Sequence, residues 1–477
     1  MLRVYMKLSK HTMIKNIVLT GLALAFTGLT RIIYNIAVVK SFDADILGQM
    51  NLIISIAMLL SLVISTITES SAVKFLSEFP SDSDRKNTFT LLQRWLLIGS
   101  LILIVATYSL QNYIFQYTKI DNSVFAISLP LILLISAHHF YRGCFYGLNA
   151  IDKYLKLEIV SMVLFFLVLW AAIFIWRQNL LWPFLAYYLL FALLGAASLR
   201  EYFRSSDNSF ALGRYIGIYG IVAALGTLAS TSKAYLANIS IGIYLSPEQV
   251  GFYSAAISIT TILMYAPTIL GRVLLPTISS SYGAGDTQTI KKLLDITTIW
   301  LSTAVFFLGG IFIILSKEIL MLLFTPAFSE AAFSLQTLIL DLCLATLALP
   351  AVSALIGTKY VRIPAFSAIF GTLVSIAVWP YIIPKFGING AAAGYIIGTT
   401  VGTVVPLFYA KKYYDMELRK LSFMILISLF LFGFATTIGS YCAKDSSWIT
   451  AFIFAASFLI TFRKDFSMIY YELRGFL

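Results

Sequence analysis

The stretch SFDADILGQMNLIISI, residues 41–56, returns 203 residues later as YLSPEQVGFYSAAISI, residues 244–259. Each copy carries an acidic residue, two further residues, a glycine and then an aliphatic run. The same offset pairs Asn35 with Asn238. Self-similarity at one fixed spacing indicates an internal duplication. We therefore expect two related halves.

The composition places both halves in a membrane. Of the 477 residues, 59% are hydrophobic and 12% are charged, against about a quarter charged in a globular protein. Apolar runs of the length that crosses a bilayer, about 20 residues, follow one another along the chain. They lack the alternation of barrel strands, so helices are the expected spans. The prediction is an all-α polytopic membrane protein of about fourteen transmembrane helices, near 16–39, 47–68, 91–115, 124–147, 158–177, 180–199, 215–242, 249–271, 293–315, 331–357, 363–383, 389–410, 421–442 and 448–462.

The duplication and the helix count together predict the domain plan. An even number of helices, six, separates the repeated stretches, so the halves have parallel topology about an axis along the membrane normal. We expect six-helix bundles at 1–199 and 200–410, then two additional helices and a cytoplasmic tail at 411–477. Parallel repeats usually enclose a midplane substrate site that opens to each side in turn. The favoured function is transport by alternating access.

The charge distribution predicts the orientation. The chain has 34 Lys and Arg residues and a net charge of +12. If the N-terminus is cytoplasmic, 26 of the 34 fall on the cytoplasmic side and six on the opposite side. This bias follows the positive-inside rule. We expect cytoplasmic termini and a lipid bilayer, rather than a nucleic acid, as the partner of the basic residues.

Three motifs give the chain a resemblance to a known family. They are the acidic-x-x-Gly helix starts DILGQMNLIISI and EQVGFYSAAISI, the stretch LLPTISSSYGAGD at 274–286, and IPKFGINGAAAGYIIG at 383–398. In the last motif, Gly387 and Gly390 permit a tight reversal, and the run through Gly394 and Gly398 permits close helix packing. The chain resembles bacterial O-antigen unit flippases of the multidrug/oligosaccharidyl-lipid/polysaccharide exporter superfamily.

The resemblance implies a substrate and a place in the cell. It implies two six-helix bundles with two extra helices, in the bacterial inner membrane. The implied activity moves undecaprenyl-diphosphate-linked oligosaccharide from the inner to the outer leaflet. It requires no cofactor, metal or catalytic residue.

Two cations lie deep in predicted helices and are candidates for substrate binding. Arg31 lies about 22 Å from the cytoplasmic end of the first predicted helix, and Lys233 is similarly deep in the seventh. A charge at the bilayer centre costs about 2.5 to 3.5 kcal/mol on insertion scales, so each should face protein or a water-filled cavity. There they could face each other and attract a diphosphate. Alternatively, each reaches the outer interface or pairs with a carbonyl oxygen. The predicted substrate-binding set also includes Asn35, Asn238 and Arg142.

Three titratable residues are candidates for ion coupling by a proton or sodium. Asp341 lies near the middle of the tenth predicted helix, where acidic residues often mark ion pathways. His138 and His139 lie in the fourth predicted helix, and imidazole titrates near neutral pH. The alternative for all three is a structural role, which for Asp341 would be pairing with Lys233. Four tryptophans near predicted outer ends indicate an interfacial belt, namely Trp176, Trp182, Trp379 and Trp448.

Other function classes remain open. A multidrug antiporter would share the fold, but cationic drugs favour acidic cavities. A lipid II flippase would share both the layout and the basic residues. A membrane polysaccharide polymerase or ligase would need a large outer loop, whereas the predicted outer loops are short and carry no HExxH, Walker A or nucleophile-elbow pattern.

Overall fold

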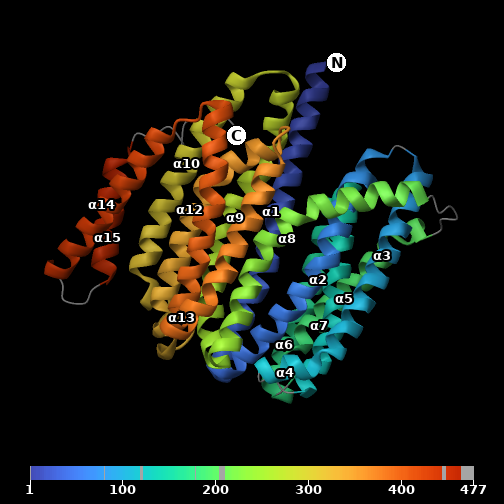
Figure 1. Ribbon diagram of the computed structural model, residues 1–477, viewed down its shortest axis with the longest axis horizontal. Coiled ribbons are helices and arrows are strands. Elements are labelled where there is room, and N and C mark those ends of the chain that lie inside the picture. The colour runs from blue at the N-terminus through green and yellow to red at the C-terminus, as the bar shows by residue number, and fades with distance from the viewer. Residues whose placement is uncertain are drawn as a thin grey trace. The chain divides into compact units, whose positions relative to one another are not determined.

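The computed structural model describes residues 2–79, 81–118, 122–177, 179–203, 210–442 and 447–463. Across these ranges the secondary structure is helical (Figure 1). The chain groups into two compact units, residues 1–254 and 255–477. The first unit contains α1 (Leu2–Ser41), α2 (Ala44–Glu78), α3 (Asp82–Ser109), α4 (Gln111–Thr118), α5 (Asn122–Gly147), α6 (Ile151–Ala171), the π-helical η1 (Ala172–Trp176), α7 (Trp182–Ser198), the 3-10 segment η2 (Arg200–Phe203), α8 (Phe210–Tyr244) and the start of α9 (Pro247–Gly283).

The second unit contains the rest of α9 and the remaining helices: α10 (Thr287–Ile314), α11 (Ser316–Leu323), the 3-10 segment η3 (Pro326–Ala331), α12 (Ala332–Ile356), α13 (Arg362–Tyr414), α14 (Leu418–Cys442) and α15 (Ser447–Thr461). The fourteen predicted segments overlap the helices of the two units, with α13 containing two of them and α3 and α4 sharing one. Nine helices of the described residues are long and apolar enough to cross a membrane. The predicted all-α membrane fold is confirmed. The predicted domain boundaries at 199 and 410 stay a prediction.

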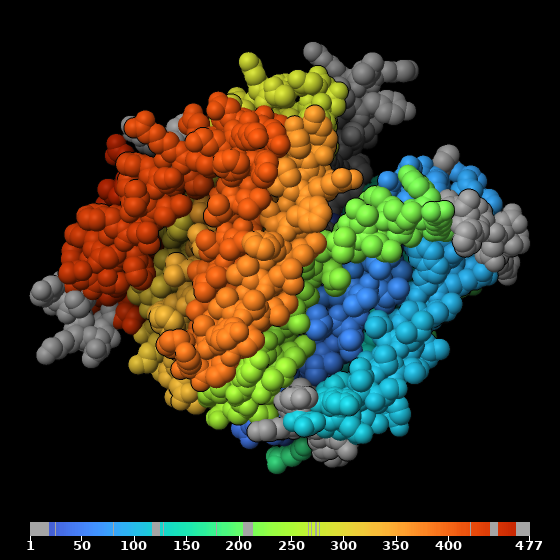
Figure 2. Space-filling view, viewed as in Figure 1, coloured from blue at the N-terminus to red at the C-terminus, as the bar shows by residue number. Residues whose placement is uncertain are grey.

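The exposed surface of the first unit is apolar where helices face outward. On α3, Leu97, Ile98, Leu101, Ile102 and Val105 are each about half exposed or more. Figure 2 shows α3 and α4 as part of the visible surface of this unit. Large exposed side chains of this kind are lipid-facing in a protein that spans a bilayer.

Within the first unit, α2 packs closely against α5. A Cβ atom on Gly147 would lie 2.5 Å from the carbonyl oxygen of Ala72, and one on Gly143 would lie 2.8 Å from that of Glu69. The two glycines are spaced four apart, which places both on one face of α5 and lets the backbones approach. The contact fixes the α5 residues that form the site described below.

The repeated stretches meet at a reciprocal crossing of α2 and α9. A Cβ atom on Gly48 would lie 1.6 Å from the carbonyl oxygen of Pro247, and one on Gly251 would lie 2.2 Å from that of Ala44. The 203-residue offset converts the first contact into the second, since it carries Ala44 to Pro247 and Gly48 to Gly251. The shared glycine of the repeat is therefore explained by packing. At the α2 end, Asp43 caps the helix by accepting a 2.8 Å hydrogen bond from the Ile46 amide.

In the second unit, α13 consists of two arms that meet at Gly387. This glycine has φ 61° and ψ −143°, a backbone conformation that glycine adopts most readily. Beyond the reversal, a Cβ atom on Gly398 would lie 2.2 Å from the carbonyl oxygen of Gly371, and Ser375 Oγ donates to the Gly394 carbonyl at 2.9 Å. The predicted reversal and close packing are both confirmed.

The predicted tryptophan belt is wrong for Trp379. Its side chain is 1% exposed, and its Nε1 donates a 3.0 Å hydrogen bond to the Ala391 carbonyl oxygen. The ring fills the space between the two arms of α13. Trp176, Trp182 and Trp448 are exposed by 46%, 46% and 61%, as a belt requires.

Candidate functional site

The first polar network of the site joins α2 to α5. Arg142 Nε donates to Glu69 Oε1 and Arg142 Nη2 donates to Glu69 Oε2, both at 2.8 Å. His139 Nδ1 lies 3.1 Å from Glu69 Oε2 and 2.7 Å from Arg142 Nη2. All three side chains are about one-fifth exposed. The Glu69 carboxylate therefore accepts a bidentate contact from the guanidinium and also contacts the imidazole. This arrangement fixes the Arg142 side chain.

The second network is more deeply buried and joins α5 to α1, α6 and α7. His138 Nε2 lies 3.2 Å from Glu158 Oε2. Glu158 Oε1 accepts hydrogen bonds from Thr27 Oγ1, at 2.6 Å, and from the Tyr187 hydroxyl. Glu158 is 1% exposed and His138 is 2% exposed. One carboxylate of α6 thus contacts groups from three other helices, and its charge depends on these partners because water does not reach it.

The two networks are adjacent because His138 and His139 are consecutive residues of α5. Their ring centroids lie 5.7 Å apart, at an interplanar angle of 84°. Residues one apart on a helix point about 100° apart, so the histidines serve different neighbours. Among the described residues, His138 Nδ1 is a buried nitrogen without a hydrogen-bond partner. Each imidazole therefore contacts one carboxylate, His138 that of Glu158 and His139 that of Glu69.

Sequence reasoning did not identify either carboxylate. Glu158 was placed at the edge of a helix predicted for 158–177, whereas α6 begins at Ile151. Glu69 lies just past the helix predicted for 47–68, whereas α2 continues to Glu78. A helix-periodicity signal through the charged stretch KYLKLE, residues 153–158, would have extended α6 and buried Glu158.

The predicted phosphate-binding cations occupy different surroundings. The Arg31 guanidinium carbon lies 5.7 Å from the centroid of the Tyr235 ring on α8, a cation–π contact. Lys233, also on α8, is 8% exposed. Residues two apart on a helix point about 200° apart, so the α8 face that meets Arg31 is not the face that carries Lys233. Both cations belong to the first unit, and their role in substrate binding stays a prediction.

Asn35 of α1 and Asn238 of α8 form buried hydrogen bonds with side chains of α2. Asn51 Nδ2 donates to Asn35 Oδ1 at 3.1 Å, and Asn238 Nδ2 donates to Ser55 Oγ at 3.0 Å. Asn35 is fully buried and Asn238 is 1% exposed. Asn51 and Ser55 lie one turn apart, so both repeat-related asparagines contact the same face of α2. This placement ties α1 and α8 to α2 close to the glycine crossing.

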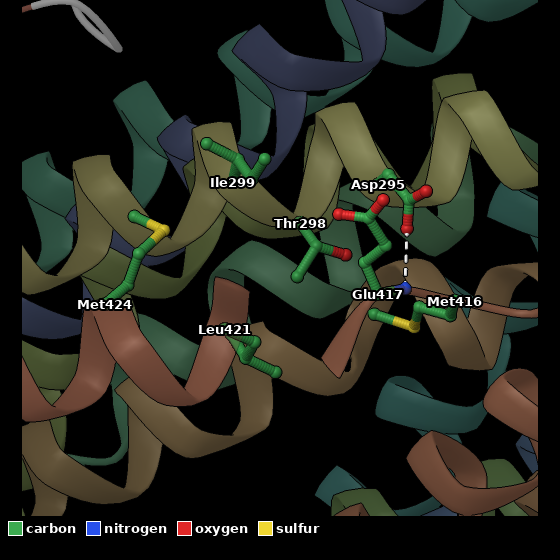
Figure 3. A pocket seen from close by; sticks show the side chains of 7 residues that line it. All are labelled: Asp295, Thr298, Ile299, Met416, Glu417, Leu421 and Met424. Atoms are coloured by element: carbon green, nitrogen blue, oxygen red, sulfur yellow. Dashed lines mark hydrogen bonds between the residues drawn. The ribbon is translucent and has the colours of Figure 1, made fainter. Parts of the chain in front are cut away.

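Asp341 belongs to the other unit, on α12, where it is 8% exposed. A small pocket of the same unit lies between α10 and the start of α14 (Figure 3). The backbone N–H of Glu417 there donates a 2.9 Å hydrogen bond to Asp295 Oδ1. The pocket is lined by Asp295, Thr298, Ile299, Met416, Glu417, Leu421 and Met424. It contains none of the predicted site residues. The described residues include no group of three or more His, Cys, Asp or Glu side chains that could hold a metal ion.

Comparisons with known proteins identify the family. A family model for "Polysaccharide biosynthesis protein" matches residues 13–282, and a MatE model matches residues 223–381. The "Probable flippase AglR" of Haloferax volcanii is 27% identical over 229 residues, which cover 46% of each chain. The chain therefore spans about half the length of this curated relative.

Two solved structures share the fold across most of both chains. "Lipid II flippase MurJ, inward closed conformation" superposes with a TM-score of 0.75 at 15% identity, covering 96% of this chain and 99% of that one. An inward-facing multidrug resistance MATE family transporter of the MOP superfamily superposes with a TM-score of 0.67 at 13% identity, covering 82% and 94%. At these identities the likeness establishes the fold. Because the first family model covers more than half of the sequence, the chain belongs to the polysaccharide biosynthesis protein family.

Proposed function

We propose that the protein is a flippase that moves undecaprenyl-diphosphate-linked oligosaccharide from the inner to the outer leaflet of a bacterial inner membrane, by alternating access. The observation that carries the proposal is the Arg31 guanidinium held over Tyr235 inside a membrane-embedded unit of a polysaccharide-family protein. A cation at that depth is costly, and an anionic substrate would offset the cost. The AglR relative is itself described as a probable flippase.

Arg142 is a weaker candidate for direct phosphate contact than Arg31. Its guanidinium already forms two hydrogen bonds with Glu69. Binding phosphate would require it to exchange a carboxylate partner for a phosphate partner. We therefore assign Arg31 and Lys233 to the substrate and Arg142 to the packing of α2 against α5.

The proposal includes ion coupling. The Glu158–His138 pair supports a proton as the coupling ion, because a buried carboxylate and imidazole in contact can share one. Asp341 on α12 is a second candidate for the same task. Asp341→Asn should weaken transport or change its dependence on pH or sodium if Asp341 takes part, and leave both unchanged if its role is structural.

The proposal is tested by expressing the protein in a flippase-null bacterial host and measuring the amount of glycan on the cell surface. Arg31→Gln should reduce surface glycan strongly, whereas Arg31→Lys should retain part of it, because the charge survives without the planar guanidinium. Protein abundance is measured in parallel. Lys40→Gln, an exposed cation at the end of α1, is the matched control. Normal surface glycan in an Arg31→Gln, Lys233→Gln double variant would exclude diphosphate binding by these residues.

The MurJ-like fold supports a second candidate function, lipid II flipping. The same expression plasmid can be introduced into a strain depleted of its own lipid II flippase. Rescue of growth there, without rescue of surface glycan in the first host, would favour lipid II. Drug resistance without either rescue would favour the multidrug antiporter alternative.

A further inference from the structure

One end of the second unit carries a stack of tyrosine rings. Tyr360, in the turn between α12 and α13, stacks on Tyr413 near the end of α13, with ring centroids 4.0 Å apart and an interplanar angle of 5°. Tyr409 extends the stack one turn earlier, 5.7 Å from Tyr413. The Tyr414 hydroxyl donates to Thr358 Oγ1 at 2.8 Å, which fixes the turn against the helix end.

Cations from both segments surround this stack. Lys359 Nζ lies 5.3 Å from the Tyr360 centroid, and Lys412 Nζ lies 5.8 Å from the Tyr413 centroid. Both lysines are exposed, and so are Arg362 and Lys411 on the two arms of α13. We name the set Tyr360, Tyr413, Lys359, Arg362, Lys411 and Lys412 the tyrosine–lysine platform.

The nearest acidic group in the sequence, Asp415, does not neutralise the platform. Its carboxylate bonds to Lys291 of α10. That hydrogen bond, together with the charges of Lys291 and of the platform residue Lys411, holds the pKa of Asp415 below its usual range. The four platform cations therefore leave an excess of positive charge at this end of the unit.

The position of the platform at the ends of membrane-spanning helices indicates which kind of anion its positive charge would attract. Both segments lie at the ends of membrane-spanning helices, on the side where the charge bias predicts the cytoplasm. Tyrosine favours the level of the lipid headgroups because its ring is apolar and its hydroxyl is polar. Basic side chains at that level attract the anionic lipids of the cytoplasmic leaflet. An excess of basic residues on one side of the membrane requires no ordered arrangement, whereas here stacked rings join two segments that each carry a lysine.

We propose that the tyrosine–lysine platform binds the phosphate of an anionic phospholipid in the cytoplasmic leaflet. Lys359 and Lys412 supply ammonium groups to the phosphate oxygens, and the stacked rings hold the two segments that carry these lysines against each other. Arg362 and Lys411 add to the local positive potential. This site needs no transport activity, so it stands independently of the flippase proposal.

Native mass spectrometry of the detergent-purified full chain tests the site. Phosphatidylglycerol is titrated against the wild-type protein and against a Lys359→Gln, Lys412→Gln variant. A basic residue near a membrane surface changes lipid affinity about fivefold, so the variant should bind at least about fivefold more weakly, with the difference shrinking at high salt. The matched control is Lys153→Gln, Lys156→Gln, two exposed lysines of α6 on the same predicted side.

Each remaining outcome overturns the proposal. Equal loss in the control variant would mean that lysines bind lipid without a built site. An equal loss of zwitterionic phosphatidylcholine would mean that charge is not the basis of binding. Preferential retention of undecaprenyl phosphate over phosphatidylglycerol would assign the platform to the transported carrier instead. Because all four replaced lysines are exposed, the variants should fold, and a melting curve in detergent confirms it.

Discussion

Glu158 illustrates how one buried side chain organises the first unit. It accepts hydrogen bonds from Thr27 and Tyr187 and contacts His138, while only 1% of the residue is exposed. Its partners come from α1, α7 and α5. Removing the carboxylate would take this partner from Tyr187 and His138 in surroundings where water cannot replace it, whereas Thr27 could still donate to the Ala23 carbonyl oxygen at 3.0 Å.

We predict that Glu158→Ala destabilises the protein by several kcal/mol, since each buried polar group left unsatisfied costs about 1 to 3 kcal/mol. Glu158→Gln should cost less, because an amide oxygen still accepts from Thr27 and Tyr187. The measurement is the thermal unfolding midpoint in detergent. Glu78→Ala is the control, because Glu78 is 51% exposed and its ion pair with Lys74 is long, at 4.0 Å. Equal midpoints for both alanine variants would contradict the prediction.

The same residue shows where sequence reasoning ends. Hydropathy locates long apolar runs. Because Glu158 follows two lysines within six residues, hydropathy predicts a connection between helices in its stretch. His138 and His139 were identified because they interrupt an apolar helix. Their carboxylate partners lie 20 and 70 residues away in sequence, and only packing of α5 against α6 and α2 reveals them.

At the scale of elements, the crossing of α2 and α9 is the tightest contact that the repeat produces. The would-be Cβ positions of Gly48 and Gly251 both fall on backbone oxygen atoms closer than real Cβ atoms approach. Backbone cannot move aside as a flexible side chain can. A methyl group at either position must therefore separate the two helix starts.

We predict that Gly48→Ala and Gly251→Ala each lower the unfolding midpoint and the protein's abundance in the membrane. Gly433→Ala on α14 is the control, because no heavy atom lies within 4 Å of its would-be Cβ. There, alanine should be neutral or slightly stabilising, as it favours helix by about 1 kcal/mol over glycine. Since the two contacts are related by the duplication, both repeat glycines should respond alike. A wild-type midpoint for Gly48→Ala would show that the helices separate without cost.

The elements also show which sequence signals determine structure. The reversal in α13 was predicted because few residues other than glycine accept the backbone angles of Gly387. Trp379 was assigned to the outer belt because an apolar ring near a predicted helix end looks the same whether it faces lipid or protein. Only the close approach of the two arms of α13 distinguishes them.

For the whole molecule, orientation decides what every other feature means. The charge bias predicts that the α12–α13 turn is cytoplasmic and the α13 reversal is external. If the orientation were the reverse, the tyrosine–lysine platform would face the outer leaflet. The proposed direction of transport would then lose its support. The fold alone does not choose between these orientations, because the predicted fourteen spanning helices would return both ends of the chain to one side either way.

We predict that single cysteines at Glu248 and Lys385 react with a membrane-impermeant maleimide in intact cells. Cysteines at Asp84 and Lys153 should react only after the membrane is opened. All four positions are exposed, so accessibility differs by side alone, and the native cysteines are first replaced. The positive-inside rule supplies the reason, since 26 of the 34 basic residues fall on one predicted side. Labelling of the Asp84 and Lys153 positions in intact cells, with protection at the other two, would invert the topology. If only one position of the Glu248 and Lys385 pair and only one of the Asp84 and Lys153 pair were labelled in intact cells, the predicted number of spanning helices between Asp84 and Lys385 would be wrong.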